Sequence, residues 1–165
     1  MSDYHFSTPS QTRHKILLCT DYSEDAEVAF VHAFDQALKY NSDLHIMNVI
    51  PSINPCGIAF DDSMPKKEGI AFTKETDERR RLQELGALKK VYYRRCRELE
   101  SFQFVVLIGS PDIEIINYAE KQNITMIFLG TSGHTEKNRR VFIRTAANVS
   151  KFSNSQVITI GSPKK

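Results

Sequence analysis

The stretch Met126–Gly133, MIFLGTSG, decides how this sequence folds. Its first four residues are apolar and unbroken, as expected of a strand buried on both faces of a parallel sheet. Gly130, Thr131, Ser132 and Gly133 follow at once. Two glycines with hydroxyls between them let the backbone approach a ligand closely and turn N–H groups toward an anion. The pattern predicts either a phosphate-binding loop or an ordinary strand-to-helix connection.

Other apolar runs have the same character of buried strands, and turn residues bound them. They are residues 16–19 (ILLC), 44–50 (LHIMNVI), 104–108 (FVVLI) and 157–160 (VITI), while the run ending at Leu129 begins at Ile124. Segments with helical spacing or helix-capping residues separate successive runs. Strands that alternate with helices predict an α/β fold, namely an open five-stranded, mostly parallel sheet with helices on both faces.

The helix after the first strand has clear start and stop signals. Ser23 is expected to be its N-cap, and Asn41 is expected to end it in a left-handed conformation. Apolar residues recur at helical spacing and are mostly small: Ala26, Ala29, Phe30, Ala33 and Ala37. This face predicts a helix that lies close against the sheet.

Weaker signals place the remaining helices. A long charged helix is expected from Thr73 to about Glu100, after a long connection at residues 52–72. Its expected buried stripe is Leu82, Leu85, Leu88, Val91, Tyr92, Cys96 and Leu99. Ser110 and Pro111 should start the next helix, which should bury Ile113, Ile116 and Ala119 and end near Asn123. A last helix is expected from about Ile143 to Phe152, burying Ala146, Val149 and Phe152, so that its N-terminus follows residue 142.

The composition is that of a soluble globular protein, with 165 residues of which 41% are hydrophobic and 25% charged. We expect a flexible tail at residues 1–13 and a single domain at 14–165. No apolar run approaches the about 20 residues of a membrane-spanning helix, and the polar N-terminus predicts a cytoplasmic protein. A net charge of +2 with mixed signs implies neither a nucleic-acid nor a membrane partner. Cys19, Cys56 and Cys96 have no metal-ligand spacing, so we expect reduced thiols and no metal site.

Four residues follow the predicted strands at or just past their C-terminal ends: Asp21, Val49, Gly109 and Gly130. Ligands of open parallel sheets bind beyond these ends, where the strand order reverses. The topology therefore predicts that the four residues converge on one crevice. His45 interrupts the second strand, which predicts either a partly covered sheet face or a hydrogen-bonded polar group in the core.

From Lys15 to Gly161 the sequence resembles the universal stress protein family. The matching pieces are residues 16–30 (ILLCTDYSEDAEVAF), 48–51 (NVIP), 106–133 (VLIGSPDIEIINYAEKQNITMIFLGTSG) and 145–161 (TAANVSKFSNSQVITIG). The resemblance implies a Rossmann-like, adenine nucleotide alpha-hydrolase-like fold and a homodimer built around the last strand. In one branch of the family it also implies ATP in the crevice, with Asp21 and Val49 at the positions that hold the adenosine portion.

The phosphate motif of that branch, Gly-x2-Gly-x9-Gly followed by Ser or Thr, is incomplete in this sequence. Gly130 and Gly133 fill its first two places, but Ile143 and Arg144 stand where the third glycine and the hydroxyl residue would be. A β-branched residue enters left-handed conformations only at a cost, which argues against a phosphate cradle. Arg144 could instead pair its guanidinium with phosphate, and a helix N-terminus after residue 142 would retain some anion affinity.

The sequence favours a non-catalytic, homodimeric stress-response protein with a degenerate adenine-nucleotide crevice and no required cofactor. The alternative is an ATP- or AMP-binding member with slow or no hydrolysis, in which Arg144 replaces the missing phosphate contacts. The candidate nucleotide-binding residues are Asp21, Val49, Gly109, Gly130, Thr131, Gly133 and Arg144. A nucleotidyltransferase is disfavoured because TDYS, without an HxGH-type pair, follows the first strand. No nucleophile and base stand at motif spacing, so no catalytic residue is expected.

Overall fold

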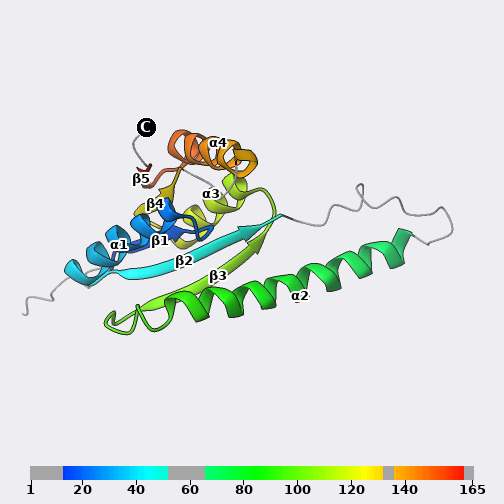
Figure 1. Cartoon of the computed structure of the whole chain (residues 1–165), viewed down its shortest axis with the longest axis horizontal. Helices are drawn as coiled ribbons and strands as arrows, with labels where there is room; N and C mark the ends of the chain where they lie inside the picture. The colour runs from blue at the N-terminus through cyan, green and yellow to red at the C-terminus, as the bar shows by residue number, and fades with distance from the viewer. Residues whose placement is uncertain (1–12, 52–65, 132–135, 162–165) are drawn as a thin grey trace, which may run out of the picture.

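The computed structural model describes residues 13–51, 66–131 and 136–161, and these form a parallel sheet covered by helices on both faces (Figure 1). The strands are β1 (Lys15–Cys19), β2 (Asp43–Ile50), β3 (Phe102–Ile108), β4 (Met126–Gly130) and β5 (Gln156–Ile160). The helices are α1 (Glu24–Lys39), α2 (Lys66–Tyr92), α3 (Pro111–Gln122) and α4 (Glu136–Phe152). The predicted alternation of strands and helices is confirmed.

The strand order is β3-β2-β1-β4-β5, with every neighbouring pair parallel. The order reverses at β1, which pairs with β2 through Leu18 and Ile46 and with β4 through Leu18 and Phe128. Because β1 is central and covered on both sides, Leu17 and Leu18 are both fully buried. Consecutive side chains point to opposite faces of a strand, so these two leucines belong to different cores.

Each face of the sheet has its own hydrophobic core. Helices α1 and α2 cover one face around Phe30, Ile46 and Tyr92, while α3 and α4 cover the other around Met47, Ile127 and Val149. Figure 1 shows α2 running along β3 and continuing beyond the end of the sheet. Among the described residues, no helix combines the length and apolar character needed to cross a membrane.

Helix α1 forms as its sequence predicts. The side chain of Ser23 caps it by accepting a hydrogen bond from the Ala26 N–H at 3.3 Å, a contact that stabilises a helix by about 1 kcal/mol. All five residues of the predicted apolar face are buried. Asn41 has φ of +48°, the left-handed conformation expected after the helix. The small residues let α1 contact both β1 and β4 closely.

The boundaries predicted for two helices are wrong. Helix α2 starts at Lys66 rather than Thr73 and ends at Tyr92, with a turn where the helix was expected to reach Glu100. Helix α4 starts at Glu136 rather than Ile143. Both upstream segments lack apolar periodicity, yet they are rich in Lys, Glu and Arg, which favour helices. The remainder of the predicted 52–72 connection lies outside the described residues.

Some residues predicted to be buried are exposed. Leu82, Val91, Ile113 and Phe152 have exposed fractions of 54%, 41%, 55% and 60%. In α3, Ala119 is buried as predicted, and Ile115 is buried in place of Ile113. Of the predicted tail, residues 1–12 lie outside the description, and Arg13 forms ion pairs with Asp43 and Glu100.

His45 is a hydrogen-bonded polar group in the core, the second of the two predicted alternatives. The residue is 3% exposed, and Nδ1 lies 3.0 Å from the Tyr118 hydroxyl and 3.0 Å from the Gln103 amide nitrogen. Burial, and secondly the charge of Lys15, lower the pKa of His45 to about 4. The imidazole is therefore neutral at physiological pH.

Candidate functional site

The carboxyl ends of β1, β2 and β4 meet in a pocket on the face covered by α3 and α4. Its described lining residues are Cys19, Thr20, Asp21, Met47, Asn48, Val49, Pro111, Ile115, Leu129, Gly130, Thr145 and Ala146. The cavity volume is about 40 Å³. The pocket lies where the strand order reverses, between β1 and β4, which is the position expected for a ligand in an open α/β sheet.

Asp21 stands in the tight turn between β1 and α1. Its Oδ1 accepts a hydrogen bond from the Ser23 N–H at 3.1 Å, which holds the carboxylate over the start of the helix. Beside it, the Thr20 N–H donates to the carbonyl of Met47 at 2.8 Å and so continues the sheet beyond β1. Within the described part of the chain, Oδ2 of Asp21 has no hydrogen-bond partner, so this oxygen can accept from a ligand.

Gly130 has a packing role that the sequence did not reveal. A Cβ placed on it would lie 2.8 Å from the backbone nitrogen of Ala26 and 3.0 Å from the carbonyl carbon of Asp25. Real Cβ atoms do not approach backbone this closely. The first turn of α1 therefore rests on the end of β4, and glycine is needed here whether or not a phosphate binds.

The structure brings three of the predicted site residues together at the pocket, whereas Gly109 and Thr131 do not line it. Asp21, Val49 and Gly130 all border the pocket. Gly109 does not line the pocket, although Pro111, two residues later, does. Gly109 has φ of +156° and connects β3 to α3. Thr131 turns toward β5, since its N–H donates to the Ile160 carbonyl at 2.8 Å and its hydroxyl lies against Gly161.

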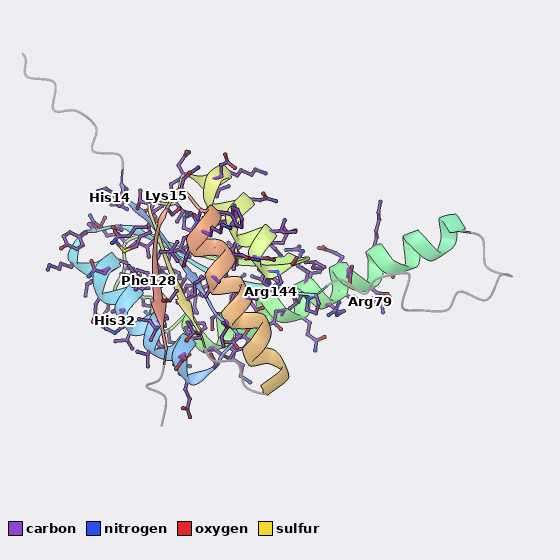
Figure 2. All side chains as sticks on the ribbon, turned by 90° about the horizontal axis from the view of Figure 1, so that it is seen from above. His14, Lys15, His32, Arg79, Phe128 and Arg144 are labelled. Atoms are coloured by element: carbon purple, nitrogen blue, oxygen red, sulfur yellow. The ribbon has the colours of Figure 1, made fainter. Side chains whose placement is uncertain are left out.

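The last two predicted residues, Gly133 and Arg144, were expected on the phosphate side of the site. Gly133 lies outside the described residues. Arg144 is an exposed residue of α4, labelled in Figure 2, next to the pocket-lining Thr145. Because α4 starts at Glu136, the predicted helix N-terminus after residue 142 is wrong, and its dipole cannot supply anion affinity at that point. Ile143 is helical, so no left-handed strain arises there.

Sequence reasoning missed much of the pocket wall. Asn48, Pro111, Ile115 and Thr145 all line it. Pro111 was recognisable as the first residue of a helix, but only the three-dimensional structure shows that it borders the pocket. No local pattern indicates that Thr145 does so, because its position depends on where α4 crosses the sheet.

Cys19 lines the pocket but is a poor nucleophile. Burial raises the pKa of its thiol far above the ordinary range, so the reactive thiolate is not populated at neutral pH. Among the described residues, no group of three or more His, Cys, Asp or Glu side chains could hold a metal ion.

The fold and the strand-end pocket define an α/β protein with a pocket at its topological switch point. The sequence matches the model of the universal stress protein family over residues 12–160. The chain therefore belongs to this family, as the sequence resemblance predicted.

Similar proteins match nearly the whole chain in sequence or in structure. Universal stress protein MJ0531 of Methanocaldococcus jannaschii is 28% identical over 153 residues, which cover 92% of this chain and 84% of the relative. The solved structure of MJ0577 from the same organism has a TM-score of 0.71 and 21% identity, covering 92% of this chain and 98% of that one. A universal stress protein from Archaeoglobus fulgidus, solved in complex with dAMP, has a TM-score of 0.50 and 18% identity, covering 90% and 97%.

Proposed function

We propose that this chain is a non-catalytic, homodimeric stress-response protein that holds the adenosine part of an adenine nucleotide in the strand-end pocket. The observation that carries this proposal is that Asp21, Val49 and Gly130, from three different strand ends, border one pocket. A carboxylate accepts hydrogen bonds from ribose hydroxyls or the adenine amino group, and a valine side chain packs on the base. The dAMP held by the Archaeoglobus fulgidus relative supports this class of ligand.

The described pocket wall offers few favourable contacts to the phosphate groups of a nucleotide. None of its described lining residues is Lys or Arg, and Thr131 turns toward β5. The cavity of about 40 Å³ is also too small to enclose a nucleoside, so the ligand would lie across the strand ends. We therefore expect weak binding of similar strength for AMP and ATP.

Replacing Asp21 with alanine is expected to weaken AMP binding by about tenfold or more, because a hydrogen bond to a charged group contributes about 1.5–3 kcal/mol. NMR titration of the labelled protein with AMP measures affinities in this weak range. The matched control is Asp35→Ala, which removes an exposed aspartate of α1 and should leave the affinity unchanged. Equal affinity of Asp21→Ala and the unmodified protein would show that the pocket is wrongly assigned.

The alternative function is nucleotide binding with Arg144 in place of the missing phosphate contacts. One observation favours it: Arg144 is exposed on α4 beside Thr145, which borders the pocket. A guanidinium pairs well with phosphate oxygens. This alternative would be established if ATP bound with low-micromolar affinity, much more tightly than AMP, and if Arg144→Ala removed that affinity. The same result would overturn our expectation that AMP and ATP bind weakly and with similar strength.

Homodimerisation through β5 is supported by the character of that strand. β5 pairs with β4 on one side, and no other described strand pairs with its second edge. Val157, Ile158 and Ile160 are only half-buried there. An apolar unpaired edge favours pairing with another strand.

We expect light scattering coupled to size exclusion to give twice the mass of the chain, and Ile158→Lys to give a monomer. A monomeric unmodified protein at working concentration would remove this part of the proposal.

A further inference from the structure

Tyr22 has an unusual backbone conformation directly beside Asp21. Its φ is +63°, in the left-handed region, which costs a residue with a Cβ about 1–2 kcal/mol. Such a conformation persists only where the surrounding contacts determine it, and it often marks a functional site. The contacts that hold Tyr22 therefore also determine where the Asp21 carboxylate lies.

Helix α2 supplies two contacts of the Tyr22 side chain. The hydroxyl donates a short hydrogen bond to Oε1 of Glu84, and the ring stacks on Tyr92 with centroids 6.4 Å apart and planes at 14°. Burial, together with the Glu84 carboxylate, raises the pKa of Tyr22, so the hydroxyl remains a donor. On the backbone side, the Tyr22 N–H donates to the Thr20 hydroxyl at 3.0 Å.

The same two residues of α2 also hold the pocket wall. Oε1 of Glu84 accepts a second hydrogen bond, from Nδ2 of the pocket-lining Asn48 at 3.1 Å. The Tyr92 hydroxyl donates to Glu27 at 2.6 Å, so in its 2.9 Å contact with Thr20 it is the acceptor. Thr20 lines the pocket as well. The turn that carries Asp21 is thus fixed from the opposite face of the sheet.

We propose that Tyr22 and Glu84 are positioning residues, which hold the β1–α1 turn in its strained conformation and thereby direct the Asp21 carboxylate into the pocket. This inference rests on the proposed adenosine site. Although α2 does not line the pocket, it would control the position of the Asp21 carboxylate and therefore its hydrogen bond to a nucleotide. Without the anchor, the turn relaxes to a negative φ at Tyr22 and the carboxylate moves away from the ligand.

The test compares two substitutions that each remove one phenolic hydroxyl. Tyr22→Phe loses the contact with Glu84, while the control Tyr118→Phe loses the contact with His45 on the other face of the sheet. We expect both to lower the melting temperature by a similar amount, since both tyrosines are half-buried. Only Tyr22→Phe should weaken AMP binding, by about five- to tenfold, in the NMR titration. Equal AMP affinity in the two variants would overturn the inference.

Glu84 allows a rescue experiment. Glu84→Gln keeps an oxygen that can accept from Tyr22 and Asn48 and should keep most of the affinity, whereas Glu84→Ala should match the loss in Tyr22→Phe. A purely structural role would lower stability in both Glu84 variants without separating their affinities, and that result would contradict the inference.

Amide exchange separates failure of the inference from failure of the proposed function. Absence of AMP binding by the unmodified protein would overturn the proposed function alone. The Ser23 amide, bonded to Asp21, should then still exchange faster in Tyr22→Phe than in Tyr118→Phe. Equal exchange rates of this amide in the two variants would overturn the positioning role.

Discussion

Replacing Gly130 with alanine is expected to lower the free energy of unfolding by about 3 kcal/mol, the upper range for overpacking a close contact. The added methyl would lie 2.8 Å from the Ala26 nitrogen and 3.0 Å from the Asp25 carbonyl carbon. These are backbone atoms in the first turn of α1, so the clash cannot be relieved by rotating a side chain. Either β4 or the start of α1 must shift. Urea unfolding followed by circular dichroism measures the change.

The matched control is Gly86→Ala, whose effect on the free energy of unfolding should have the opposite sign. Gly86 lies within α2, and a Cβ there would meet no atom within 4 Å. Alanine is favoured over glycine in a helix, so Gly86→Ala should raise the free energy of unfolding by about 0.5–1 kcal/mol. If Gly130→Ala were as stable as the unmodified protein, the close packing of α1 on β4 would be wrong, and a ligand contact would remain the reason for this glycine.

Gly130 also shows how far the sequence could define the site. The pattern MIFLGTSG correctly placed the end of a buried strand, because an unbroken apolar run followed by glycine has few other interpretations. It could not show which neighbour needs the glycine. That neighbour is α1, which lies about a hundred residues earlier in the chain, and only the three-dimensional structure brings the two together.

The convergence of Asp21, Val49 and Gly130 was predictable for a different reason. In a parallel sheet all strand ends of one kind lie at one edge, so identifying the strands is enough to place the residues that follow them. The phosphate side was not predictable in the same way. It depends on where α4 begins, and a helix start made of charged residues leaves no apolar periodicity to detect. The sequence therefore placed Arg144 in the first turn of a helix, whereas it lies further inside α4.

The stability of this protein is expected to fall on acidification because of His45. Its pKa in the folded chain is about 4, against 6.5 for an unperturbed histidine. Burial disfavours the charged imidazolium, and Lys15 adds repulsion, while Asp43 acts weakly in the opposite direction. A lowered pKa means that the unfolded chain takes up the proton first. The contribution of neutral His45 is therefore complete above about pH 6.5 and is lost as the pH falls toward about 4.

The size of this effect follows from the shift in pKa. Each unit corresponds to about 1.4 kcal/mol, and allowing for solvent screening we expect about 2 kcal/mol to be lost between about pH 7 and about pH 4. His45→Gln keeps a hydrogen-bonding side chain beside Tyr118 but cannot be protonated. Urea unfolding should show that the free energy of unfolding falls between about pH 7 and about pH 4 by about 2 kcal/mol less in His45→Gln than in the unmodified protein. Carboxylates that titrate toward the acidic end of this range are common to both proteins and cancel in the difference.

His32→Gln is the control for this experiment, because His32 is exposed on α1 (Figure 2) and should leave the pH dependence as it is in the unmodified protein. Parallel declines in the free energy of unfolding of the unmodified protein and of His45→Gln would mean that His45 takes up a proton in the folded state as readily as in the unfolded chain. In that case the contacts with Tyr118 and Gln103 would have to be reassigned, since an imidazolium donates from both nitrogens and needs an acceptor at each. The Gln103 amide would then have to present its oxygen to the ring, and the β2–α3 core would hold a buried charge.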